Sequence, residues 1–184
     1  MNIPNYITLF RLLLTPFFFT VLVSYVPGKE YYRWAALGLF VTASLTDALD
    51  GFLARVWKKR TMLGKFLDPL ADKMLLVSGY LGLLFVHTLP YRPPLWITVT
   101  IVFRDVIIIL GLVSIFLISG KLRVQPNGLG KCTTAFQMLT LVFILLEWPP
   151  AVFSYYATAI LTILSCLVYM FREVRLLRTS DSVL

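Results

Sequence analysis

Charged residues are scarce in this chain of 184 residues, because Asp, Glu, Lys and Arg together make up 14% of it. In a typical soluble domain they make up about a quarter. Hydrophobic residues account for 59%, and the mean hydropathy is +0.83. The composition therefore predicts an all-α integral membrane protein. It predicts one membrane domain over residues 1–184 and leaves no room for a separate soluble domain.

Cysteine and histidine are almost absent, with two Cys and one His. Cys132 and Cys166 are far apart and lack metal-ligand spacing, which argues against a disulfide framework and a thiolate-bound metal. His87 lies near a predicted helix end, where packing is a more common role than metal binding. The N-terminal apolar run contains Arg11 and no small-residue cleavage site follows it. We therefore expect a retained helix there rather than a signal peptide.

Six apolar stretches divide the chain, at residues 5–26, 32–56, 68–89, 93–120, 129–147 and 150–171. Each is long enough for a transmembrane helix, so we expect six of them. Lys and Arg gather between the second and third stretches, between the fourth and fifth, and in the C-terminal tail. Basic residues favour the cytoplasmic side, which predicts that both termini are cytoplasmic. The net charge of +8 fits an anionic lipid surface better than nucleic acid.

Aspartate is concentrated in one short window, although the chain has only nine acidic residues. Asp47 and Asp50 are three residues apart, and Asp68 and Asp72 are four apart, so each pair shares a helix face. A short connection makes the two helices antiparallel neighbours. We therefore expect four carboxylates to converge at one point. Oxygen ligands of this kind suit Mg²⁺, Mn²⁺ or Ca²⁺. The nearby basic residues Arg55, Lys65 and Lys73 are also available as counter-charges, and pairing with Lys and Arg is the alternative to metal binding.

Small residues accompany these aspartates. Gly51, Ala54 and Gly64 leave bare backbone that a phosphorylated ligand can approach, although small residues also pack helices together in membranes. The pattern D-x₂-D-G-x₂-A-R-x₈-G-x₃-D-x₃-D, which ends at Asp72, resembles the signature of the CDP-alcohol phosphotransferase family. The opening NIPNYITLFRLLLTPFF and the block LDPLADKMLL are similar to those of the bacterial phosphatidylglycerophosphate synthases within that family.

This resemblance implies an enzyme that moves a phosphatidyl group from CDP-diacylglycerol to an alcohol and releases CMP. It implies that Asp47, Asp50 and Asp68 hold two divalent ions, Mg²⁺ or Mn²⁺, and that Asp72 completes the site and is the general base. It assigns the CDP pocket to Gly51, Ala54, Arg55, Gly64, Asn5 and Thr8. It further implies a homodimer in the bacterial inner membrane, among membrane lipids, with its active site on the cytoplasmic side.

The acceptor is expected beside Asp72, at basic residues on the same side of the membrane. Arg104 lies deep in an apolar stretch and is predicted to bind an acceptor phosphate, with structural pairing to Asp105 as the alternative. Lys131 precedes a predicted helix, whose N-terminal amides also favour anions. It is therefore also predicted to bind the acceptor phosphate, with contact to the lipid surface as the alternative. Glycerol 3-phosphate is the first prediction for the acceptor.

Two alternatives stay open at this point. Phosphatidylglycerophosphate synthases usually have Arg-Glu where this chain has Arg104-Asp105, and they have a second Arg further along that this chain lacks. The Arg-Asp form, with QPNGLGKCTTAFQM, resembles the cardiolipin synthases of the same family, whose acceptor is phosphatidylglycerol. A cation transporter is a more distant alternative, because its carboxylates would follow a path near mid-membrane.

Overall fold

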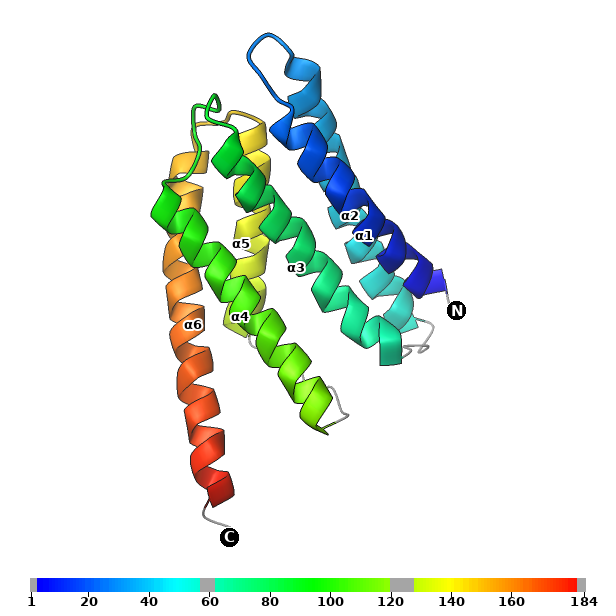
Figure 1. Ribbon diagram of the computed structural model, residues 1–184, viewed down its shortest axis with the longest axis vertical. Helices are drawn as coiled ribbons and strands as arrows, with labels where there is room; N and C mark the ends of the chain where they lie inside the picture. Colours follow the sequence, from blue (N-terminus) through cyan, green and yellow to red (C-terminus); the bar gives the residue numbers. More distant parts are fainter. Residues whose placement is uncertain (1–2, 57–61, 120–127, 182–184) are drawn as a thin grey trace.

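The computed structural model describes residues 3–56, 62–119 and 128–181, with side chains for Tyr6 and residues 8–46, 70–111, 113–114 and 128–168. The described residues form six helices and no strand (Figure 1). The helices are α1 (Ile3–Val23), α2 (Glu30–Val56), α3 (Met62–Phe85), α4 (Leu95–Ser119), α5 (Gly128–Leu145) and α6 (Ala151–Asp181). The prediction of an all-helical fold is confirmed.

The six helices follow the six apolar stretches, with two differences in length. α3 begins at Met62, well before the predicted residue 68. Gly64, Asp68 and Asp72 therefore recur every four residues along one face of a single helix. α6 continues to Asp181, beyond the predicted end at residue 171, because the basic tail contains no proline or glycine to stop it.

Consecutive helices run in opposite directions, as short connections require. The N-terminal ends of α1, α3 and α5 lie at the same end of the bundle as the C-terminal ends of α2, α4 and α6, which is the lower end in Figure 1. α3 is central, since it packs against α1, α2, α4 and α5, while α6 packs against α5 and α4. Both halves of the aspartate motif thus belong to the lower end of the bundle.

Two glycines of α3 allow its neighbours to come close. A Cβ atom at Gly79 would lie 2.8 Å from Cδ1 of Leu141 on α5. A Cβ atom at Gly82 would lie 2.7 Å from Cδ2 of Leu22 on α1. Leu22 and Leu141 are fully buried. Bare backbone at these positions therefore lets α1 and α5 pack directly onto α3.

The outer surface is also apolar. On α4, Phe103, Ile107 and Leu110 form a stripe whose side chains are 66%, 55% and 59% exposed, and Phe153 and Ile160 are exposed on α6. Water-soluble monomers rarely leave such continuous apolar faces uncovered. Within the described part of the chain, two segments, Gly128–Leu145 and Ala151–Val168, are long and apolar enough to cross a membrane by length and composition alone.

A polar cluster around Arg33 fastens the end of the bundle opposite the aspartates. Nε of Arg33 donates to Glu30 at 2.8 Å, and NH1 donates to the backbone oxygen of Leu145 at 2.9 Å. The second bond satisfies a carbonyl in the last turn of α5. The hydroxyl of Tyr25 also donates to Glu30, at 3.1 Å, and Glu147 lies 3.6 Å from Nε of Arg33. The loop after α1, the start of α2 and the end of α5 are thereby linked.

His87 lies at this same end, just after α3, and its Nδ1 contacts NH1 of Arg92. Both side chains line a cavity of about 380 Å³ whose other walls are leucine and proline. Among the side chains that the structure describes, no three His, Cys, Asp or Glu residues gather as a metal site would require. The His87 side chain is exposed and contacts Arg92, so it lies at the surface rather than in the packed interior.

Candidate active site

The aspartate motif is carried entirely by two helices. α2 carries Asp47, Asp50, Gly51, Ala54 and Arg55, and α3 carries Gly64, Asp68 and Asp72. The two helices pack against each other, and these segments lie at the same end of the bundle (Figure 1). Of this set, Asp72 is the one whose side chain is described. The convergence of the four carboxylates therefore lies outside the described residues and stays a prediction.

Asp72, the predicted general base, is held by an arginine from another helix. NH1 of Arg11 on α1 donates to Oδ1 of Asp72 on α3. The Arg11 side chain is fully buried, whereas the Asp72 side chain is 25% exposed. A buried guanidinium is costly unless a carboxylate compensates it. This ion pair therefore fixes the orientation of the Asp72 carboxylate while leaving part of it open to a ligand.

The face of α1 that meets α3 also carries Thr8, one of the two residues of this helix predicted for the nucleotide pocket. Thr8 is fully buried and precedes Arg11 by three residues. Asn5 precedes Thr8 by another three, although its side chain lies outside the described ones. Residues three apart share a helix face. Thr8 thus lies on the side of α1 that holds Asp72, and the place of Asn5 in the nucleotide pocket stays a prediction.

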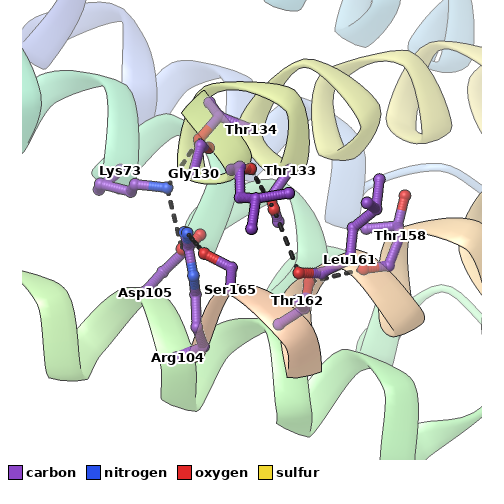
Figure 2. A network of polar contacts seen from close by, with 11 residues as sticks. Lys73, Arg104, Asp105, Gly130, Thr133, Thr134, Thr158, Leu161, Thr162 and Ser165 are labelled. Carbon is purple, nitrogen blue, oxygen red and sulfur yellow. Dashed lines mark hydrogen bonds and ion pairs between the residues drawn. The ribbon is translucent and has the colours of Figure 1, made fainter. Parts of the chain in front are cut away.

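Figure 2 shows a second polar cluster, which joins four helices. Nζ of Lys73 on α3 donates to Oδ1 of Asp105 on α4 at 2.9 Å, and to the Thr134 hydroxyl on α5 at 3.2 Å. NH1 of Arg104 donates to the same oxygen of Asp105 at 2.7 Å, and NH2 donates to the Ser165 hydroxyl on α6 at 2.8 Å. One carboxylate oxygen is therefore shared by two cations.

The charges of this cluster do not cancel, since two cations face one carboxylate and leave a net charge of about +1. Asp105 is fully buried, and Arg104 is 4% exposed. The structure therefore shows the Arg104–Asp105 pairing that was the alternative to acceptor binding. The partnership of Lys73 with Asp105 was missed, because the sequence suggested Lys73 only as a counter-charge for the aspartate motif.

Lys131, the other predicted acceptor ligand, is exposed in the first turn of α5. It precedes Thr134 by three residues, so the two side chains share a face of that helix. Because Thr134 accepts a hydrogen bond from Lys73, the structure brings Lys131 to the part of α5 that borders the cluster. The charge of Lys131 thus adds to an already positive region.

Hydroxyl groups fasten α5 to α6 and so hold Ser165 in place. The Thr133 hydroxyl donates to the backbone oxygens of Leu129 at 2.8 Å and of Leu161 on α6 at 3.3 Å (Figure 2). Further along the same interface, Thr140 hydrogen-bonds to Ser154 at 2.6 Å and to Thr158 at 2.9 Å. These bonds satisfy buried hydroxyls in an apolar interior, where an unpaired one is costly.

The sequence contained one signal for the missed role of Arg11. An arginine inside an apolar helix is expensive, and it usually marks a functional partnership. The partner itself could not be predicted, because Arg11 and Asp72 are 61 residues apart in the sequence. The same holds for Lys73 and Asp105, which are 32 apart.

Comparison with known proteins shows to which family this chain belongs. The family model for CDP-alcohol phosphatidyltransferases matches residues 1–171. The chain belongs to the CDP-alcohol phosphatidyltransferase family. The resemblance noticed in the aspartate motif is thereby confirmed.

Curated relatives extend over nearly the whole chain. A protein of Sodalis glossinidius is 38% identical over 184 residues, covering 93% of this chain and 94% of its own length. A protein of Escherichia coli K12 is 36% identical over 179 residues, covering 92% of this chain and 93% of its own length. Both are named CDP-diacylglycerol–glycerol-3-phosphate 3-phosphatidyltransferase.

Proposed function

We propose that this CDP-alcohol phosphatidyltransferase moves the phosphatidyl group of CDP-diacylglycerol to glycerol 3-phosphate, yielding phosphatidylglycerophosphate and CMP. The observation that carries the proposal is the match to the family over residues 1–171, within which the aspartate motif is complete. The names of the relatives favour glycerol 3-phosphate over phosphatidylglycerol as the acceptor. The chain would thus act in phospholipid biosynthesis.

In this reaction Asp72 takes the proton from the acceptor hydroxyl. The hydroxyl oxygen forms a bond to the phosphorus of the phosphatidyl group, and the bond between that phosphorus and the CMP oxygen breaks. CMP leaves with the electron pair of the broken bond. A general base must lie within hydrogen-bond reach of the proton that it removes. The contact between Arg11 and Oδ1 of Asp72 supports this role, because it holds the carboxylate in one orientation.

Divalent metal ions fit the predicted donor set, which consists of Asp47, Asp50, Asp68 and Asp72. All four donors are carboxylates, and they lie on neighbouring helices at one end of the bundle. Carboxylate oxygens are the ligands that Mg²⁺ and Mn²⁺ prefer. When bound, two such ions would neutralise charge on the diphosphate of the donor. We propose that Arg55 and the small residues of the motif complete the CDP pocket.

We also propose that all six helices cross the bacterial inner membrane with both termini in the cytoplasm. The helices contain 18 to 31 residues, and about 20 residues span the hydrocarbon core of a bilayer. The exposed apolar stripes on α4 and α6 would face lipid tails. The active site would then open to the cytoplasm, where glycerol 3-phosphate and CMP are dissolved and the lipid donor stays in the bilayer. A homodimer is part of this proposal, as the family resemblance implies.

Purified protein supplied with CDP-diacylglycerol and Mg²⁺ or Mn²⁺ tests the choice of acceptor. Glycerol 3-phosphate and phosphatidylglycerol are offered in parallel reactions, and CMP and the lipid products are measured. We expect CMP release with glycerol 3-phosphate and little with phosphatidylglycerol. CMP release with phosphatidylglycerol alone would establish a cardiolipin synthase instead. A reaction without metal shows whether the divalent ions are needed.

A further inference from the structure

We propose that Lys73 contacts the phosphate of the acceptor directly, and that Asp105 and Arg104 are positioning residues that hold its ammonium group in place. This inference rests on the proposed transfer to glycerol 3-phosphate. It adds a residue that is not part of the aspartate motif, and it gives Arg104 an indirect role.

The position of Lys73 next to the proposed base carries the first step. Consecutive Cα atoms are about 3.8 Å apart, and consecutive side chains of an α-helix diverge by about 100°. Asp72 accordingly faces α1 through Arg11, whereas Lys73 faces α4 and α5 through Asp105 and Thr134. The base and the ammonium group thus lie on adjacent sides of α3. A small acceptor that carries a hydroxyl and a phosphate could therefore contact both groups at once.

The hydrogen bonds of Lys73 leave it able to bind a ligand. A lysine ammonium group has three N–H donors. In the described structure, Asp105 accepts one at 2.9 Å and Thr134 accepts another at 3.2 Å. The third donor remains, and the Lys73 side chain is 12% exposed. Lysine is a common point-charge ligand for phosphate, so a phosphate group can complete this coordination.

Arg104 is much less accessible. Its side chain is 4% exposed, and both terminal nitrogens donate to protein partners, Asp105 and Ser165. In Figure 2 the guanidinium group reaches Asp105 from α4, and Lys73 reaches the same carboxylate from α3. The guanidinium group keeps further N–H donors, including a buried Nε that makes no hydrogen bond in the described structure, but a side chain that is 4% exposed offers a phosphate little access to them. Arg104 therefore acts through Asp105, whose oriented oxygen fixes the ammonium group of Lys73.

The charge of the cluster favours the same conclusion. Asp105 is shared by two cations, so the cluster keeps a net charge of about +1 and attracts a phosphate dianion. Lys131 is exposed one turn before Thr134 on α5, where it can contact the same phosphate from another side. A phosphate monoester gains more from these charges than a phosphodiester does, because it carries more negative charge. Lys73 would thereby favour glycerol 3-phosphate over a lipid acceptor.

Steady-state kinetics of Lys73→Met, Lys73→Arg and a control, Lys29→Met, test the proposal. Lys29 is exposed at the opposite end of the bundle, so the control makes the same chemical change far from the site. We expect Lys73→Met to raise the KM for glycerol 3-phosphate about tenfold or more, as loss of a charged hydrogen bond does. The KM for CDP-diacylglycerol should change less than about twofold. Lys73→Arg should recover part of the loss, and Lys29→Met should behave as wild type.

The substitution Lys73→Met leaves Asp105 paired with Arg104, so the variant is expected to fold, which its unfolding temperature and gel-filtration elution check. Should it fail to fold, Thr134→Val removes one hydrogen bond to Lys73 without changing charge, and a smaller rise in the same KM is expected. Ser165→Ala removes a hydrogen bond to Arg104, so it should also raise the KM for glycerol 3-phosphate while kcat stays unchanged.

The outcomes separate this inference from the proposed function. A wild-type enzyme that turns over glycerol 3-phosphate, with an unchanged KM in folded Lys73→Met, overturns the role of Lys73 alone. If Lys73→Met is unfolded, an unchanged KM for glycerol 3-phosphate in Thr134→Val overturns the role of Lys73 instead. Absence of wild-type turnover with glycerol 3-phosphate refutes the proposed function and this inference with it.

Discussion

The ion pair between Arg11 and Asp72 allows a double-mutant cycle in which stability and activity should respond differently. Removing one member of a buried ion pair typically costs about 3 to 5 kcal/mol. Arg11 is fully buried, whereas Asp72 is 25% exposed. Asp72→Asn removes a counter-charge from a buried cation, so it should lie near the lower end of that range, at about 3 kcal/mol. Arg11→Met leaves a carboxylate that water can reach, so it should cost less, about 1 to 2 kcal/mol.

The double variant Arg11→Met/Asp72→Asn removes both charges together. Groups in direct contact show coupling energies of about 0.5 to 3 kcal/mol. We expect the double variant to be no less stable than Asp72→Asn alone, with a coupling of about 2 kcal/mol. For a chain of this size, 1 kcal/mol shifts the unfolding midpoint by about 2 to 4 °C. Thermal unfolding in detergent, without metal or donor, measures all four proteins.

Activity should follow a different order. Asp72→Asn should lower CMP release about 10²- to 10⁴-fold, the range typical for loss of a general base. Arg11→Met should lose less activity, because Asp72 is still present as the base although its carboxylate is no longer held in one orientation. If the stability loss of the double variant equals the sum of the two single losses, the reasoning about the ion pair is refuted. Near-normal turnover by Asp72→Asn would refute the assignment of the base.

Three further predictions follow from other parts of the molecule. Gly82→Ala should lower the unfolding temperature, since its Cβ would meet the buried Leu22, whereas Gly111→Ala, with open space around it, should keep or raise that temperature. The hydrogen bond from Arg33 lowers the pKa of Glu30, which precedes the apolar stretch 32–56. The stabilisation is therefore present above the ordinary pKa of glutamate and is lost as the pH falls below it. As the pH is lowered from 5 to 3, the unfolding temperature should fall less steeply in Glu30→Gln than in wild type. Removal of divalent ions with a chelator should abolish CMP release, and adding back Mg²⁺ or Mn²⁺ should restore it.

The helices could be predicted because their signal is local. Long apolar stretches separated by proline, glycine and charge predicted six helices in the right order, and the described part of the chain contains six. The end of α6 was missed, because the apolar run ends near residue 171 while the helical backbone continues into a charged segment. Hydropathy marks where a chain is apolar, and it does not mark where a helix stops.

The aspartate motif could also be recognised from spacing alone, since helical periodicity fixes which side chains share a face. The side-chain contacts between different helices could not be predicted in this way, because they depend on how the helices pack. Acceptor binding by Arg104 stays a prediction, and the structure adds the contacts of its guanidinium group to Asp105 and Ser165. Lys73 was considered only beside the aspartates, yet it lies against α4 and α5. The contacts of Arg104 with Ser165 and of Lys73 with Asp105 join residues 61 and 32 positions apart in the sequence, which spacing alone cannot reveal.

The central claim is that this chain transfers a phosphatidyl group to glycerol 3-phosphate. The most direct test places wild type and Asp72→Asn in liposomes with CDP-diacylglycerol, Mg²⁺ and isotopically labelled glycerol 3-phosphate, and measures CMP and labelled lipid together. The account predicts equal amounts of CMP and labelled phosphatidylglycerophosphate with wild type, and almost none with Asp72→Asn. CMP release without label in the lipid, or labelled lipid formed equally by both proteins, would contradict it.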